Sequence, residues 1–326
     1  MNLVSQLLYI VSIILLTIVP VLLCVAFLTL AERKIMGAMQ RRIGPSVWGF
    51  AGLLQPFLDG LKLVVKQPLL PSNSDAPLYV LAPSLTFIVS QIAWAAIPAS
   101  ALYNLCDLPL GAMYILAVSS MGVYGLLLAG WSSNSKYAFL GCLRSVAQMI
   151  SYELGMSTVV LTVCLVAGSF SLSEIISSQE LGWFLFALWP QAILFFICCL
   201  AETNRAPFDL SEAEAELVAG YLTEYASAGF ALYFIAEYAN MILMSALCAI
   251  FFLGGQSSPI PGDTILPGSF WLISKTMFFL FLFVWVRATL PRYRYDQLMR
   301  LGWKTIIPLT FGGFLLAASI IVSFST

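Results

Sequence analysis

The chain has 326 residues, of which 60% are hydrophobic and only 10% are charged, with a formal net charge of −1 and a mean hydropathy of +0.94. The hydrophobic content exceeds the roughly 45–50% typical of soluble domains, and it falls in blocks long enough to cross a bilayer. This composition excludes an ordinary soluble enzyme. It predicts an all-α polytopic membrane protein in which residues 1–326 form a single integral-membrane helical bundle.

At about 20 residues per span, the apolar blocks predict eight transmembrane helices. Secretory and transit signals begin with positive charge, whereas the first basic residue here is Arg33. The first apolar block is therefore expected to remain as a transmembrane helix. The eight expected spans are 3–30, 79–102, 112–131, 146–168, 183–201, 227–253, 269–289 and 305–324.

Basic residues distinguish the two sides of this bundle. Of the 15 Lys and Arg residues, all except Lys275 lie in the odd-to-even connections or at the helix ends beside them. The other connections and both termini contain none, so the positive-inside rule predicts the basic connections on the matrix or cytoplasmic side and both termini opposite. The expected inside loops are 31–78, 132–145, 202–226 and 290–304.

The first inside loop contains an amphipathic pattern. Between Phe50 and Val65 the apolar residues recur at helical intervals, which predicts a helix lying in the membrane interface, with Pro56 bending it. The pattern alone leaves open whether this helix is a passive anchor or takes part in function. The opposite face carries the polar residues Gln55, Asp59, Lys62 and Lys66.

The third inside loop concentrates acidic residues. Residues 201–225 hold six of the 16 acids in the chain against one base, Arg205. Because an acid at the centre of a membrane helix costs about 2.5–3.5 kcal/mol to insert, this concentration favours proton handling or contact with a partner. Residues 211–214 fit a capping box, and acids in a first helical turn also complement the helix dipole. The six acids are Glu202, Asp209, Glu212, Glu214, Glu216 and Glu224.

Three ionisable residues, Glu153, Glu237 and Lys275, fall inside expected spans. Intramembrane acids most often mark proton relays, and a structural Glu–Lys pair is the alternative. In the last inside loop, residues 287–304 carry five basic residues against one acid. That loop is interpreted as an interfacial belt, a site for acidic headgroups, or a partner of the acidic third loop.

No cofactor motif is visible. The chain has seven cysteines and no histidine, and the cysteines lack the CxxC spacing of metal, haem or iron–sulfur sites. Neither a GxGxxG nor a Walker-type phosphate loop is present. Any redox centre is therefore expected on a partner protein.

Several segments are distinctive enough to be compared with known families. The longest runs from Ala201 to Tyr225, and the others are 31–34, 42–45, 52–62, 130–137, 151–153, 237–240 and 291–298. Through these segments the chain resembles, over nearly its whole length, the subunit 1 family of mitochondrial NADH:ubiquinone oxidoreductase, respiratory complex I. The long acidic motif is highly specific, whereas short pieces such as Gly-Pro are not.

The resemblance implies a membrane-arm subunit of this proton-pumping enzyme that has no redox centre or catalytic residue of its own. It would form much of the chamber by which ubiquinone enters, and an acidic path that couples quinone reduction to proton translocation. Lys275 joins this acidic path as the third ionisable residue inside a span. The implied quinone-path residues are Arg33, Gln40, Arg42, Asp59, Phe230, Phe234 and Arg287. The implied coupling acids are Glu153, Glu202, Asp209, Glu212, Glu214, Glu216, Glu224 and Glu237.

The resemblance also implies ubiquinone as substrate, with FMN and iron–sulfur clusters in partner subunits. The expected partners are the quinone-site subunits of the hydrophilic arm, neighbouring membrane-arm subunits and phospholipids, with no nucleic acid. The expected location is the mitochondrial inner membrane, with both termini on the intermembrane-space side. Two alternatives are an autonomous secondary transporter, for which no inverted repeat is visible, and the related subunit of a membrane-bound hydrogenase.

Overall fold

The regular structure of the protein is entirely helical where it is described. Seven helices are long and apolar enough to cross a membrane, and an eighth, Trp189–Glu202, is apolar but shorter. No strand occurs among the described residues, so the predicted all-α polytopic fold is confirmed. The computed structural model describes residues 3–98, 106–180, 182–209, 220–259 and 266–325.

The helices follow the apolar blocks of the sequence. The long helices are α1 Leu3–Met39, α3 Ala76–Ile92, α4 Gly111–Ser132, α5 Lys136–Ala167, α8 Trp189–Glu202, α10 Ser227–Leu253, α11 Gly268–Thr289 and α13 Ile307–Ser325. The shorter elements are η1 Phe50–Gly52, α2 Gln55–Val65, η2 Ala93–Ala96, α6 Leu172–Ser178, α7 Phe184–Ala187, η3 Gly220–Thr223, α12 Tyr295–Leu301 and η4 Gly302–Ile306.

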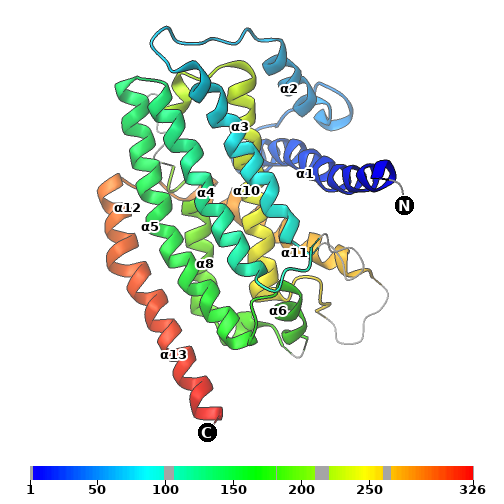
Figure 1. The fold of residues 1–326 in the computed structure, drawn as a ribbon, viewed down its shortest axis with the longest axis vertical. Helices are drawn as coiled ribbons and strands as arrows, with labels where there is room; N and C mark the ends of the chain where they lie inside the picture. Colours follow the sequence, from blue (N-terminus) through cyan, green and yellow to red (C-terminus); the bar gives the residue numbers. More distant parts are fainter. Residues whose placement is uncertain (1–2, 99–105, 181, 210–219, 260–265, 326) are drawn as a thin grey trace.

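Helix α10 forms the centre of the bundle. It packs against α3, α11, α1 and α8, while α5 packs against α4, α8 and α13. Every residue of α10 from Met241 to Leu253 is buried, as expected for a helix surrounded by other helices. Figure 1 shows α3, α4, α5, α8 and α10 standing together, with α13 along the outside of α5.

Helix α1 leaves this bundle at a steep angle, and its N-terminal end points away from the other helices (Figure 1). Its 37 residues make it about 55 Å long, well beyond the roughly 30 Å of a bilayer core, which favours a strong tilt. Only its C-terminal part packs closely, through the buried side chains of Val25, Leu28 and Leu30. The same part of α1 carries Glu32, which is also buried.

The connections gather at two opposite ends of the bundle, as the distribution of basic residues predicts. At the basic end, the backbone N–H of Asp75 donates to the carbonyl of Ser132 at 3.1 Å, which joins the start of α3 to the α4–α5 turn. At the other end, the Ser173 hydroxyl donates to Asp107 at 2.8 Å, which joins α6 to the segment before α4. The side of the membrane that each end faces remains a prediction.

Two predicted boundaries differ from the structure because prolines and caps start helices. The expected loop 132–145 is mostly helical, since Ser135 caps α5 by accepting from the N–H of Ala138 at 3.4 Å. The expected span 183–201 is divided into α7 and α8, with Pro190 in the first turn of α8, where proline favours a helix start. The 14 residues of α8 extend only about 21 Å.

The first and last inside loops also differ from the prediction in their helices. Pro56 lies in the first turn of α2 and begins that helix, so the prediction that it bends a longer helix was wrong. The expected helix over 50–65 is instead the η1 turn followed by α2. The loop 290–304 contains α12 and most of a π-helical turn. The capping box predicted over 211–214 lies outside the described residues.

Candidate functional site

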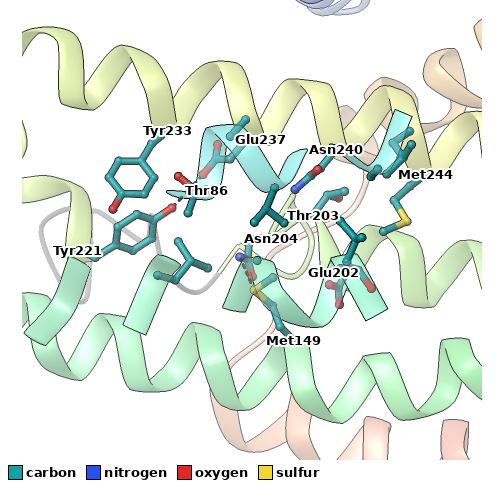
Figure 2. A pocket seen from close by; sticks show the side chains of 18 residues that line it. Thr86, Met149, Glu202, Thr203, Asn204, Tyr221, Tyr233, Glu237, Asn240 and Met244 are labelled. Carbon is teal, nitrogen blue, oxygen red and sulfur yellow. Dashed lines mark hydrogen bonds between the residues drawn. The ribbon is translucent and has the colours of Figure 1, made fainter. Parts of the chain in front are cut away.

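A polar cavity of about 60 Å³ lies between α3, α4, α5, α10 and the end of α8. Two of the predicted coupling acids line it, Glu202 from the end of α8 and Glu237 from α10. Figure 2 shows Glu237 and Asn240 on one wall, with Glu202 and Asn204 across from them. A cavity of this size with several polar groups has room for a few hydrogen-bonded water molecules.

Glu202 reaches the cavity because α8 ends there and the chain turns sharply. Its side chain is only 6% exposed, and its Oε2 atom has no hydrogen-bond partner among the described residues. Asn204 follows in the left-handed backbone region, with φ of 48°, where Asn is better tolerated than most side chains. The turn thus leaves an acid, a hydroxyl and an amide facing one cavity.

A third predicted acid, Glu153, belongs to the same group. Ser119, which lines the cavity, lies with its hydroxyl 3.4 Å from Oε1 of Glu153 and donates to it. Glu153 is also close enough to Glu202 for their negative charges to repel each other. Two acids that are widely separated in sequence, Glu202 and Glu237, therefore line one polar space, and Glu153 lies next to it.

Glu237 is held by two neighbouring side chains, Tyr221 and Arg205. The Tyr221 hydroxyl donates to its Oε1 atom at 3.0 Å. The Nη2 atom of Arg205 lies 4.0 Å from its Oε2 atom. Arg205 is 6% exposed, and its guanidinium lies over the Tyr238 ring at 4.3 Å from the ring centroid.

Glu32 is a site residue that the sequence reasoning missed. It is 3% exposed and accepts a hydrogen bond from the Tyr238 hydroxyl at 2.6 Å. It forms a close ion pair with Arg287, and its Oε1 atom lies 3.9 Å from Nη1 of Arg205. The available signal was its position, because it is the first charge after an uncharged block of 31 residues.

Four of the predicted quinone-path residues contact one another in two pairs. Arg33 and Asp59 form an ion pair of 2.6 Å between α1 and α2. Arg42 donates to Gln40 at 2.7 Å just beyond α1. All four of these side chains are at least partly exposed, whereas the Glu32–Arg287 contact lies deeper.

Two aromatic residues of α10 continue the predicted quinone path toward Glu32. The rings of Phe230 and Phe234 lie 4.6 Å apart. Phe234 in turn stacks on Tyr238 at 6.3 Å, and Tyr238 donates to Glu32. The predicted path thus runs through adjacent side chains from α10 to the end of α1.

Helix α2 presents its apolar face outward. Leu61, Val64 and Val65 are 59%, 71% and 83% exposed. On its polar face Gln55 and Asp59 are partly buried, with Gln55 donating to Asp59 at 3.1 Å, whereas Lys62 and Lys66 are exposed. An apolar face left open beside a membrane protein suits contact with lipid or a lipid-soluble ligand.

The acidic third loop and the basic last loop contact each other. Arg292 forms an ion pair of 3.0 Å with Asp209, and the ring of Tyr293 stacks on Phe208 at 5.7 Å. Gln148 holds the loop segment 201–208 by donating to the carbonyls at both of its ends, Ala201 and Phe208, each at 2.8 Å. Of the three interpretations of the last loop, docking against the third loop is the one that the contacts support.

Two predicted coupling residues lie apart from the cavity. Glu224 is half-buried, and its carbonyl accepts from Tyr79 at 2.5 Å. Tyr79 stacks on Tyr225 at 4.2 Å, and burial raises the pKa of Tyr225, which keeps its hydroxyl protonated. Lys275 donates to three carbonyls at the end of α10, at 2.6, 3.0 and 2.6 Å. The predicted acids that lie outside the described residues are Glu212, Glu214 and Glu216.

Comparisons with known proteins match nearly the whole chain. A family model described as NADH dehydrogenase matches residues 12–318. NADH-ubiquinone oxidoreductase chain 1 of Arabidopsis thaliana is 56% identical over 309 residues, covering 94% of this chain and 95% of the relative. An NADH-quinone oxidoreductase subunit of Rickettsia typhi is 56% identical over 307 residues, covering 93% of this chain and 91% of the relative. The corresponding protein of Rickettsia bellii is 55% identical over 308 residues, with the same coverage.

Proposed function

The chain belongs to the NADH dehydrogenase family, and from this membership we propose that it is a membrane-arm subunit of a proton-pumping NADH:ubiquinone oxidoreductase. It forms much of the chamber through which ubiquinone enters, and it carries part of the acidic path that couples quinone reduction to proton translocation. FMN and the iron–sulfur clusters belong to partner subunits. The subunit works in the mitochondrial inner membrane with both termini on the intermembrane-space side.

One observation carries this proposal: the predicted quinone-path residues and the predicted coupling acids lie side by side. Glu32 contacts Arg287 of the quinone path. The guanidinium of Arg205 lies 3.9 Å from Glu32 and 4.0 Å from Glu237 of the acid cavity. Charges in such a buried place interact far more strongly than in water. A change of charge in the quinone path therefore changes the electrostatic potential at the acids in the cavity.

The surroundings of each group suit its role. On the quinone side, α2 offers an open apolar face for an isoprenoid tail, next to the Arg33–Asp59 pair that can contact a polar headgroup. On the acid side, Glu202 and Glu237 line a polar cavity with room for water, and Glu153 contacts the cavity-lining Ser119. Water and neighbouring carboxyls together allow protons to move between acids.

The Asp59→Ala variant tests the quinone part of this proposal. Asp59 and its partner Arg33 are 38% and 51% exposed, and such exposed pairs contribute about 0–1 kcal/mol to stability, so the complex should assemble. If α2 lines the quinone entrance, the variant changes the KM for ubiquinone or the inhibitor sensitivity. Electron transfer from NADH to artificial acceptors stays normal, because those acceptors take electrons in partner subunits.

Asp75→Ala serves as the matched control, because Asp75 is also an exposed aspartate at the basic end of the bundle but lies outside the predicted quinone path. Its quinone kinetics should equal those of the unmodified complex. Unchanged quinone kinetics in a fully assembled Asp59→Ala complex would return α2 to the role of a passive anchor. That result would contradict the proposed quinone entrance.

A further inference from the structure

Arg205 lies almost equally far from two carboxylates, the buried Glu32 and the partly buried Glu237. Its Nη1 atom is 3.9 Å from Oε1 of Glu32, and its Nη2 atom is 4.0 Å from Oε2 of Glu237. A close charge-assisted hydrogen bond is about 2.7–2.9 Å long. The guanidinium is therefore about 1 Å from a close pair with either acid.

The backbone of Arg205 is held while its side chain has a surface along which to move. The N–H of Arg205 donates to the carbonyl of Leu200 at 3.3 Å, and Gln148 holds the loop at both ends. The guanidinium lies over the flat ring of Tyr238 at 4.3 Å, a contact that survives small sideways shifts. Arg205 and Glu237 each have at least one further interaction besides these.

The two guanidinium groups near Glu32 share one oxygen atom. Arg287 and Arg205 both approach Oε1 of Glu32, the first closely and the second at 3.9 Å. The side chain of Arg287 is 31% exposed, against 7% for Arg205, so Arg287 is the one that a ligand can reach. If a negative charge draws Arg287 away, the Oε1 atom becomes available to Arg205.

We propose that Arg205 is a two-position positioning residue that transmits a charge change near Arg287 to Glu237. This inference rests on the proposed function, because the negative charge is the one created when quinone is reduced. When Arg287 turns toward that charge, Arg205 moves to Glu32. Glu237 loses its nearby cation and takes up a proton from water in the cavity. When the charge is neutralised, Arg287 returns to Glu32, Arg205 moves back, and Glu237 releases the proton.

Infrared difference spectroscopy of the assembled complex, quinone-reduced minus oxidised, tests this inference. The C=O stretching band of protonated Glu237 should appear on quinone reduction and is assigned by its loss in Glu237→Gln. In Arg205→Gln no cation is left to move away, so Glu237 stays protonated and its band is already present in the oxidised spectrum. In Glu32→Gln, Arg205 stays beside Glu237, so the band is absent in both states.

In both variants the redox-dependent part of the band should therefore be lost. A reduced-minus-oxidised spectrum lacks the band in both variants, so each oxidised variant is also compared with the oxidised unmodified complex. That comparison should show the protonated Glu237 band in Arg205→Gln and not in Glu32→Gln, whereas general damage would shift both variants in the same way. Arg300→Gln is the matched control, because Arg300 is exposed and lies on α12, and its difference band should equal that of the unmodified complex.

The outcomes distinguish this inference from the proposed function. A Glu237 band that persists in assembled Arg205→Gln or Glu32→Gln overturns the role of Arg205 and leaves the quinone chamber untouched. Absence of the band in the unmodified complex also overturns it. Failure of the proposed function is detected separately, by unchanged quinone kinetics in Asp59→Ala. If Arg205→Gln does not assemble, Glu32→Gln, which keeps the side-chain volume, decides the question.

Discussion

Substitution of Glu202 by Gln removes one titratable group from the polar cavity and keeps the side-chain volume. Glu202 is 6% exposed, and one of its oxygen atoms has no hydrogen-bond partner among the described residues. Holding a charge in such a place is costly, so a neutral amide should be tolerated. We expect the free energy of unfolding to change by about 1 kcal/mol or less, the usual net value of one hydrogen bond, and the complex to assemble.

The effect on proton movement should be much larger than the effect on stability. Glu202 lies close to Glu153 and lines the same cavity as Glu237. A positioned acid or base typically speeds a proton transfer by about 10²–10⁴-fold. If protons pass through Glu202, the number of protons translocated per electron falls, while electron entry from NADH continues.

Reconstitution of the variant complex in liposomes measures both quantities. A pH-sensitive dye records proton translocation while absorbance records NADH oxidation, and the content of assembled complex is determined on the same sample. Glu174→Gln is the matched control, because Glu174 is exposed on α6 at the opposite end of the bundle. A normal proton-to-electron ratio in well-assembled Glu202→Gln would show that Glu202 is not required for coupling.

Three further predictions concern topology and the two ends of the bundle. With the exposed Cys24 and Cys106 replaced, single cysteines at Lys136 and Glu174 should react with an impermeant reagent from opposite sides of the membrane; reaction of both from one side contradicts the predicted topology. Lys275→Met removes three hydrogen bonds to carbonyls at the end of α10, each worth about 0.5–1.5 kcal/mol net. It should lower the Tm of the complex and spare the proton-to-electron ratio, whereas the reverse result would support a role of Lys275 in coupling. Arg292→Ala should destabilise the docked loops by about 1 kcal/mol or less, because the Arg292 side chain is 42% exposed; the difference should shrink at high salt in thermal unfolding, and a larger loss at high salt would refute the ion-pair explanation.

The membrane spans and the acidic loop could be predicted from local patterns. A long uncharged block has few alternatives to a transmembrane helix, because unsatisfied backbone groups are not tolerated in lipid. The expected range 227–253 coincides with α10 for this reason. The concentration of acids in residues 201–225 is visible in the sequence itself. It indicates function because a charge buried in a membrane protein is costly.

Helix starts were predicted less well, because they depend on a few residues rather than on average hydropathy. Ser135 caps α5, so this helix begins ten residues before the expected span. Pro56 and Pro190 each lie at the start of a helix. From the sequence, Pro56 was expected to bend a helix, and Pro190 was expected to lie inside an apolar span.

The composition of the site depends on contacts between distant parts of the chain. Glu32 meets Tyr238 across 206 positions and Arg287 across 255. Such meetings depend on how each helix is rotated and at what angle it crosses its neighbours, which hydropathy does not specify. For the same reason, the sequence could not distinguish Glu202 from Glu224, two acids of the third loop, whereas packing brings Glu202 and not Glu224 to the cavity beside Glu237.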